Sequence, residues 1–306
     1  MMERSKRLLK QFLQLPADAL VASSTKLPNR ILQLAHRSVY LSDGFYPYKP
    51  DQKSYILRNP SGQGRERPYL QLPAPPQDLW MGYETTIDDF LNSGRKNVET
   101  MKGLLESSGF CIKEGKRILD FGCAAGRMIR WLDDIAKQSE IWGVDVSAEH
   151  IIWCQQHLAP PFYFCTVTTA PHLPFEDGYF DLIYAGSVFT HIADLADAWF
   201  LELKRIVKPG GRLYITVHDK HTIDLALNSG PSSYKDLLLP FCKKENIGEL
   251  DFDMFTINRG RLTVEWPMAQ VFHNIDYLRR HWGRIMKMLS VTEEAYYSQT
   301  AIVFEK

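Results

Sequence analysis

Two aspartates and two glycines near the middle of the chain have the residue types and the spacing of a ligand site. Asp120 stands at the end of an apolar run, Gly122 and Gly126 follow in the stretch "DFGCAAG", and Asp145 ends the next apolar run. Glycine allows a backbone to approach a ligand closely. A carboxylate at the end of a neighbouring strand can accept hydrogen bonds from ribose hydroxyls. The pattern therefore indicates a nucleoside-binding turn.

The charge of Asp120 indicates which nucleoside this turn would bind. Gly122 and Gly126 do not fit the GxGxxG register of dinucleotide-binding loops, in which a pyrophosphate lies on a helix N-terminus. Asp120 would repel a pyrophosphate and would attract an ammonium or a sulfonium. With Asp145 on the ribose, the two acids favour an adenosine that carries positive charge, which means S-adenosylmethionine (SAM). The middle position is Ala124 where a GxGxG loop has glycine, and we expect it not to require a positive φ.

Alternating strands and helices are predicted to position these residues. A helix is predicted over residues 86–110, with a break at Asn92-Ser93-Gly94. Apolar runs predict strands over residues 117–121, 140–147, 162–167, 180–189, 211–219, 284–291 and 299–306. Amphipathic segments predict helices over residues 126–137, 147–158, 194–207 and 275–283, with Ser147 as the N-cap of the second. Apolar runs joined by helices predict a parallel sheet covered on both faces, with an antiparallel strand pair at the end of the chain.

The chain is predicted to have an N-terminal arm, a main domain and an insertion. Residues 1–80 are irregular, with a segment from Gly44 to Pro76 that is rich in Pro, Gly, Tyr and Arg, and we expect an arm that wraps on the domain over residues 81–306. An amphipathic stretch within the first 13 residues would pack either on the domain or on a second copy of the chain, and the second arrangement would give a homodimer. The alternative is that this stretch forms a helix on a membrane surface. Residues 220–274 form an insertion after the fifth strand, of the kind that serves as a lid or binding loop.

Five motifs in order resemble a class I SAM-dependent methyltransferase, of the broad group that includes small-molecule methyltransferases. "ILDFGCAAG" resembles the first motif, "GVDVS" the second, and "LPFEDGYFDLIYAGSVFTHI" the third and fourth. "ELKRIVKPGGRLYITV" resembles the helix, turn and strand that follow, and the closing strand pair resembles the family's sixth and seventh strands. The resemblance implies an α/β fold, a Rossmann-like doubly wound and mostly parallel seven-stranded sheet with an antiparallel last strand. It also implies SAM as cofactor and S-adenosylhomocysteine as product.

The resemblance also implies which residues hold the cofactor. On the methionine and ribose side these are Asp120, Gly122, Ala124 and Gly126, and Ser187 lies beside the methionine part. Asp145 would bind the ribose, and Val146 would lie against the adenine. Thr169 and Ala170 would lie near the adenine amino group. Tyr83, which precedes the core, is a candidate to close over the methionine carboxylate.

The acceptor is expected to be a small molecule or a sugar, methylated most readily at oxygen. A hydroxyl acceptor needs a base, and His191 and His218 follow the fourth and fifth predicted strands. A packing role is the alternative for each histidine. The fourth strand is not followed by a [DNS]PP[YFW] tetrapeptide or a Pro-Cys pair, which disfavours adenine-nitrogen and cytosine-carbon chemistry. We expect no metal, because no His, Asp and Glu cluster has the spacing of a metal site.

Composition limits the other possibilities. Lys and Arg total 36 and Asp and Glu total 36, so the chain lacks the basic surplus typical of nucleic-acid binders. The five cysteines form no CxxC pair, and we expect a reducing, cytoplasmic setting with no transmembrane segment. An RNA or protein methyltransferase remains an alternative, since a basic cluster on the arm would serve it. A non-catalytic partner subunit with this fold is another.

Overall fold

The structure is a computed structural model that describes residues 72–228, 235–236, 238–239, 252–258 and 269–306. All of them belong to one of the two compact units into which the chain divides. Most of the predicted N-terminal arm and much of the predicted insertion lie outside these residues, so the homodimer and membrane-surface interpretations of the arm stay predictions.

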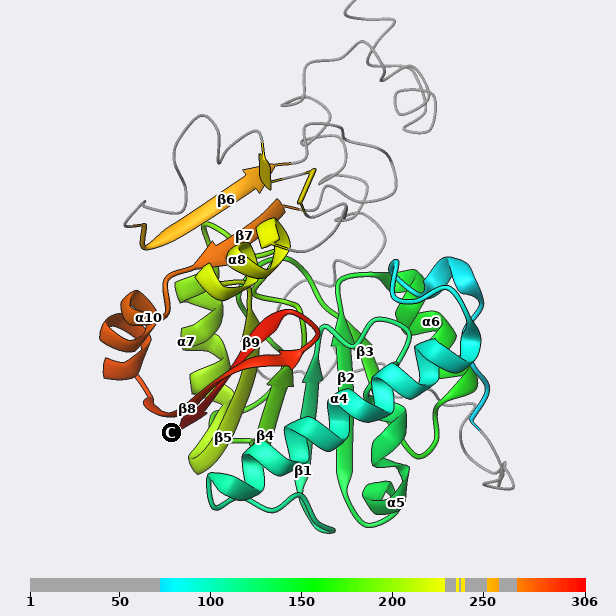
Figure 1. The fold of residues 1–306 in the computed structure, drawn as a ribbon. Helices are drawn as coiled ribbons and strands as arrows, with labels where there is room; N and C mark the ends of the chain where they lie inside the picture. The colour runs from blue at the N-terminus through cyan, green and yellow to red at the C-terminus, as the bar shows by residue number, and fades with distance from the viewer. Residues whose placement is uncertain (1–71, 229–234, 237, 240–251, 259–268) are drawn as a thin grey trace, which may run out of the picture. The chain divides into compact units, whose positions relative to one another are not determined.

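A seven-stranded sheet runs through the described part of the chain (Figure 1). Its order is β3-β2-β1-β4-β5-β9-β8. The strands are β1 (Arg117–Phe121), β2 (Glu140–Asp145), β3 (Tyr163–Thr166), β4 (Phe180–Ala185), β5 (Val207–Val217), β8 (Lys287–Tyr296) and β9 (Gln299–Glu305). The first five are parallel, β9 is antiparallel to β5, and β8 is antiparallel to β9. The prediction of a mostly parallel, doubly wound sheet with an antiparallel last strand is therefore confirmed.

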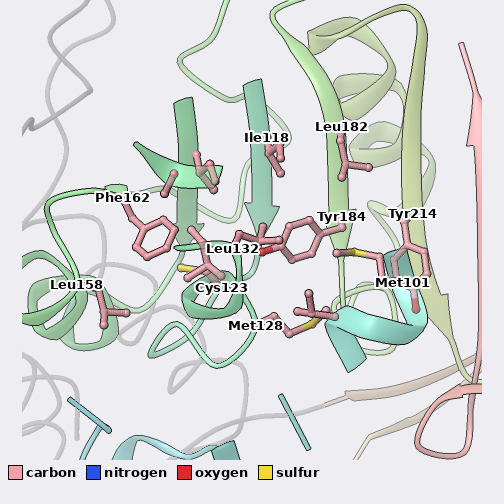
Figure 2. Packing of buried hydrophobic residues seen from close by; sticks show 14 of the residues in the cluster. Met101, Ile118, Cys123, Met128, Leu132, Leu158, Phe162, Leu182, Tyr184 and Tyr214 are labelled. Atoms are coloured by element: carbon pink, nitrogen blue, oxygen red, sulfur yellow. The ribbon is translucent and has the colours of Figure 1, made fainter. Parts of the chain in front are cut away.

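Helices cover both faces of this sheet, which explains the continuous apolar runs of its strands. The helices are α4 (Ile87–Ser107), α5 (Asp133–Ala136), α6 (Ala148–His157), α7 (Ala196–Ile206), α8 (Lys220–Asn228) and α10 (Ile275–His281). Successive residues of β1 point to opposite faces: Ile118 packs in the cluster that contains α4 and α6, and Leu119 packs in the cluster that contains α7 and α10. Figure 2 shows the first cluster, with Met101 of α4 beside Tyr184 and Tyr214.

Two predicted helices differ from the observed ones. The segment after the β1 loop forms a 3-10 helix at Ile129–Leu132 and the single-turn α5, where the sequence predicts one helix over residues 126–137. Arg127 and Arg130 are buried in this segment together with the predicted apolar residues Met128, Ile129, Leu132 and Ile135. In contrast, α4 continues through Asn92-Ser93-Gly94, so the predicted break is wrong.

Gly94 serves close packing and does not break α4. A Cβ atom at Gly94 would lie 2.5 Å from the carbonyl oxygen of Arg127, which is well inside van der Waals contact. The helix can therefore approach the segment after β1 only because residue 94 has no side chain. Thr86 begins the helix by accepting the N–H of Asp89.

A second, two-stranded sheet lies within the predicted insertion. It pairs β6 (Met254–Asn258) with β7 (Ala269–His273) in antiparallel register. β7 also contacts the end of β5, because His218 forms a bridge with Phe272 and its carbonyl accepts the N–H of His273 at 2.7 Å. The described part of the insertion therefore lies at the carboxyl ends of the parallel strands (Figure 1).

The contact at Gly94 yields a matched pair of helix substitutions. Gly94→Ala should destabilise the protein by about 1 to 3 kcal/mol, because the added methyl group overpacks the contact with Arg127. Gly103→Ala, on the same helix with no atom within 4 Å of its would-be Cβ, should stabilise it by up to ~1 kcal/mol. Urea denaturation of both variants measures the difference. Equal effects of the two substitutions would contradict the packing role of Gly94.

Candidate functional site

The loop between β1 and the following 3-10 helix requires glycine at both of its ends. Gly122 has φ +81° and Gly126 has φ +75°, a region that other residues rarely occupy. A Cβ at Gly122 would lie 2.4 Å from Cγ2 of Val188, and a Cβ at Gly126 would lie 2.4 Å from Cδ1 of Leu158. The loop is therefore pressed against the segment after β4 on one side and against the end of α6 on the other.

Ala124 also has a left-handed backbone, with φ +44°. The expectation that this position does not require a positive φ is wrong. An L-residue in this region costs roughly 1 to 2 kcal/mol relative to the right-handed conformation. The N–H of Ala124 donates to Oδ2 of Asp145 at 2.8 Å, and this hydrogen bond offsets part of the cost. Its carbonyl oxygen accepts weak hydrogen bonds from the thiols of Cys123 and Cys154 at 3.5 and 3.4 Å.

Asp145 connects the β1 loop to the start of α6. While Oδ2 accepts from Ala124, Oδ1 accepts from the N–H of Ser147 at 2.8 Å, and Ser147 in turn caps α6 through His150 N–H, as its sequence position predicted. Burial raises the pKa of the Asp145 carboxyl, and these backbone N–H groups oppose the shift. The adjacent Val146 is 40% exposed, which leaves an apolar surface next to the carboxylate.

Asp120, at the end of β1, is the most unusual charge in the site. Its side chain is buried, and burial raises its pKa to about 7. The hydroxyl of Tyr184 lies beside the Asp120 carboxyl and favours its ionised form. Within the described residues, however, neither the Tyr184 hydroxyl nor Oδ2 of Asp120 makes a hydrogen bond of normal geometry. A buried carboxylate oxygen with no donor can accept one from a cationic ligand.

Tyr83 lies against Arg127, a residue that the sequence reasoning did not select. The Arg127 guanidinium stands 4.4 Å from the centre of the Tyr83 ring, and the Tyr83 hydroxyl accepts from the hydroxyl of Tyr296 at 3.3 Å. The signal was present in the sequence, because an arginine directly after Gly126 interrupts the apolar face of the predicted helix. Such an interruption indicates a buried charge with a specific role.

The remaining predicted cofactor residues have different surroundings. Thr169 and Ala170 are exposed in the segment after β3. Ser187, with φ +59°, is tied into a network after β4: its N–H donates to Oγ1 of Thr216 at 2.7 Å, and its hydroxyl accepts from Nε2 of Gln299 at 2.8 Å. Ser187 therefore links the β4 loop to β5 and β9.

The two histidines lie together where β7 meets the ends of β4 and β5. Nδ1 of His191 is 3.0 Å from the carbonyl oxygen of Ala269, which must accept its proton. His218 is buried and stacks on Phe272 with ring centres 5.3 Å apart. Burial, with the nearby charge of His191, lowers the pKa of His218 to about 3. His218 is therefore neutral at pH 7 and a weak base there.

The structure brings most of the predicted residues to one edge of the sheet. Asp120 and Asp145 lie at the carboxyl ends of β1 and β2, and Ala124 of the loop after β1 contacts Asp145. Val188 places the segment containing Ser187 against Gly122. The histidines lie farther along this edge, at β4 and β5. Among the described residues, no cluster of three or more His, Cys, Asp or Glu side chains is arranged to hold a metal ion. None of the described helices combines the length and apolarity that crossing a membrane requires.

Comparisons with known proteins identify the segment that contains this edge. Residues 119–215 match the family described as methyltransferase domain. The chain is 28% identical over 119 residues to the ubiquinone/menaquinone biosynthesis C-methyltransferase UbiE of Chromobacterium violaceum, covering 38% of this chain and 48% of that protein. It is 27% identical over 103 residues to the fatty-acid O-methyltransferase of Mycolicibacterium smegmatis, covering 34% of this chain and 37% of that protein. The chain thus spans less than half the length of these curated relatives.

A solved structure is also similar to part of the chain. The S-adenosylmethionine-dependent methyltransferase from Clostridium acetobutylicum superimposes with a TM-score of 0.48 at 12% identity, over 69% of this chain and 90% of that one.

The raised pKa of Asp120 makes a prediction about stability. The unfolded Asp120 ionises near its ordinary pKa of 3.8, and the folded one near 7, so the folded state binds more protons and loses stability as pH rises between these values. Asp120→Asn removes this cost. Its stability advantage over the wild type should grow by about 2 to 3 kcal/mol from pH 5 to pH 8.

Urea denaturation of both proteins at pH 5, 6, 7 and 8 measures this advantage. Asp177→Asn, at an exposed carboxylate that pairs with Arg205, is a control that should show no such growth. A constant difference between Asp120→Asn and wild type across this range would contradict the buried, raised pKa of Asp120.

Proposed function

Residues 119–215 form a class I SAM-dependent methyltransferase domain, and from that premise we propose that the chain transfers a methyl group from SAM to a hydroxyl of a small molecule or sugar. The observation that carries the proposal is the pair of carboxylates at the ends of adjacent strands, Asp120 and Asp145. One is buried with an unpartnered oxygen, and the other lies next to an exposed apolar residue. These are the acceptors that a positively charged adenosine needs.

The donor set fits the methionine part of SAM. The unpartnered Oδ2 of Asp120 would accept a hydrogen bond from the ammonium group, since a buried carboxylate gains most from a cationic donor. The left-handed glycines at 122 and 126 let the loop pack tightly against Val188 and Leu158, which fixes the loop backbone that would face the ligand. Tyr83 and Ser187 stay candidates for the outer part of this side.

The same edge fits the adenosine part. Each oxygen of Asp145 accepts one backbone N–H and keeps a second lone pair, which would accept from a ribose hydroxyl. The exposed Val146 would contact the adenine ring. Thr169 and Ala170 follow β3, the neighbouring strand, and would lie near the adenine amino group.

On the acceptor side the chain must align a hydroxyl and take its proton. The bound cofactor supplies a methyl group on a sulfonium with a neutral leaving group, so that alignment provides most of the rate acceleration. His191 is the better candidate base, because the Ala269 carbonyl accepts the proton on Nδ1, so that the lone pair of the neutral ring lies on Nε2. The low pKa of His218 suits a packing role instead.

The acceptor class rests on the residues around His191 and on the relatives. β7, which binds this histidine, belongs to the insertion, and we propose that the insertion and the N-terminal arm form the acceptor pocket. The relatives' names include a C-methyltransferase of quinone biosynthesis and a fatty-acid O-methyltransferase. Both names refer to small molecules, and the balanced charge of this chain agrees with such an acceptor.

The ribose assignment predicts a loss of cofactor affinity in Asp145→Ala. We expect S-adenosylhomocysteine to bind at least about tenfold more weakly, because two hydrogen bonds to a carboxylate are lost and the Ala124 turn is released. Isothermal titration calorimetry measures the dissociation constant. Ser147→Ala, which removes only the cap of α6, is the matched control and should change affinity by less than about threefold. Unchanged affinity in Asp145→Ala would contradict the assignment.

The base assignment predicts a separate effect in His191→Ala. Transfer of labelled methyl groups to a hydroxyl acceptor found by screening should fall by about 10² to 10⁴. The affinity for S-adenosylhomocysteine should stay within about twofold of wild type, because His191 lies outside the proposed cofactor residues. His218→Gln is the control for local packing. If His191→Ala keeps full turnover, His191 has only a packing role.

A further inference from the structure

A closed ring of three hydrogen bonds holds Ser187 in the segment after β4. The Ser187 N–H donates to Oγ1 of Thr216 at 2.7 Å, the Thr216 hydroxyl donates to Oε1 of Gln299 at 2.6 Å, and Nε2 of Gln299 donates to the Ser187 hydroxyl at 2.8 Å. Thr216 on β5 and Gln299 on β9 are both buried. The ring therefore ties Ser187, with its left-handed φ of +59°, to two strands of the main sheet.

The chemistry of the groups sets the direction of each hydrogen bond in this ring. A backbone N–H can only donate, so Oγ1 of Thr216 accepts from Ser187 and has its own proton left to give. The amide oxygen of Gln299 is the acceptor for that proton. The reverse orientation of the amide would leave the proton of the fully buried Thr216 hydroxyl without an acceptor among the described residues. The NH₂ group of Gln299 must therefore donate to the Ser187 oxygen.

Thr190 supplies a second hydrogen bond to the same oxygen. Its hydroxyl lies 3.2 Å from the Ser187 hydroxyl, a distance that allows either oxygen to donate. Thr190 is fully buried, and in the described part of the chain Ser187 is the hydrogen-bond partner of its hydroxyl. The Thr190 proton must therefore go to Ser187, because a buried hydroxyl without an acceptor is unfavourable.

Ser187 is left as a pure hydrogen-bond donor. Its oxygen accepts from Gln299 and from Thr190, and a hydroxyl oxygen has two lone pairs, so its capacity to accept is filled. Among the described residues its own proton has no acceptor, and its side chain is only half-buried. Any ligand group that pairs with Ser187 must therefore accept a hydrogen bond.

Ser187 follows the strand that neighbours Asp120. Tyr184 of β4 pairs with Asp120 of β1, and Ser187 comes soon after Tyr184 in the chain. The adjacent Val188 packs on the β1 loop, since a Cβ at Gly122 would lie 2.4 Å from its Cγ2. One segment thus offers a carboxylate oxygen without a donor, and the neighbouring segment offers a hydroxyl proton without an acceptor. The two complement the ammonium and carboxylate groups of an amino acid, which share one carbon atom.

We propose that the Ser187 hydroxyl donates to the carboxylate of the methionine part of the cofactor, and that Gln299, Thr216 and Thr190 are positioning residues that orient it. The proposal rests on the proposed SAM site. Hydrogen bonds in a chain polarise one another, so a hydroxyl that accepts two of them is a stronger donor. A negatively charged acceptor gains most from such a donor.

A packing role and a contact with the methyl acceptor are the alternatives for Ser187. If the hydroxyl only stabilises the segment after β4, its loss weakens every ligand of the site to the same extent. If the hydroxyl contacts the methyl acceptor, its loss lowers turnover and leaves the affinity for S-adenosylhomocysteine unchanged. Only the carboxylate role separates ligands that have this group from ligands that lack it.

The test measures two ligands by calorimetry: S-adenosylhomocysteine, and its decarboxylated analogue, which keeps the ammonium group. Ser187→Gly removes the hydroxyl and accepts the left-handed backbone without strain. This variant should bind S-adenosylhomocysteine about tenfold more weakly than wild type and the decarboxylated analogue within about twofold. Gln299→Leu keeps the hydroxyl but loses its orienting donor, and should bind S-adenosylhomocysteine about threefold more weakly.

Thr300→Val is the matched control for Gln299→Leu. Thr300 is the next residue on β9, is equally buried and donates to Asp219 outside the ring at 2.8 Å. This variant should bind both ligands within about twofold of wild type, and urea denaturation confirms that each variant is folded.

Equal losses for the two ligands in Ser187→Gly would overturn the proposal in favour of packing. Unchanged affinity of Ser187→Gly for S-adenosylhomocysteine would overturn it in favour of a contact with the methyl acceptor. Gln299→Leu with wild-type affinity would overturn the positioning role of the ring. Failure of the wild-type protein to bind either ligand would instead reject the SAM site itself.

Discussion

The hydrogen bond from the Ala124 N–H to the Asp145 carboxylate holds the candidate site in its shape. It joins the loop after β1 to the end of β2, and the same carboxylate accepts the N–H of Ser147 at the start of α6. In this arrangement Ala124 lies in the left-handed region. Asp145 therefore has two tasks in this account, since it fixes the turn and also faces the proposed ribose. A carboxylate can do both because each oxygen has two lone pairs.

Two buried charges set the electrostatics on the other side of the loop. Asp120 and Arg127 are both nearly excluded from solvent, and neither neutralises the other through an ion pair in the described part of the chain. Burying a charge without a partner is unfavourable, and proteins retain such charges mainly at functional sites. A ligand with a positively charged group would give the Asp120 carboxylate the ionic partner that it lacks among the described residues. Arg127 is held in place by hydrogen bonds to Ser93, Asn97 and Tyr296.

Local sequence patterns predicted the strands and helices of the main sheet. Backbone conformations and side-chain surroundings that depend on long-range contacts could not be predicted in this way. The order of strands and helices followed from apolar runs, and the Ser147 cap followed from its position before an amphipathic segment. The predicted break at Gly94 was wrong because that glycine serves a long-range contact. Gly94 and Arg127 pack against each other, and nothing within 20 residues of either one signals that contact. Similarly, the φ of Ala124 depends on Asp145, and the environment of His191 depends on β7, 78 residues away.

The number of protons released when the cofactor product binds tests the central claim most directly. Such release requires that the site binds the ligand and that the buried Asp120 carboxyl loses its proton on binding. S-adenosylhomocysteine can be titrated into the wild-type protein in buffers of different ionisation enthalpy. With a pKa of about 7 for free Asp120, binding should release about 0.9 proton at pH 6, about 0.5 at pH 7 and almost none at pH 8.5. Binding with no proton release at pH 6 and 7, or with proton uptake, would contradict the account.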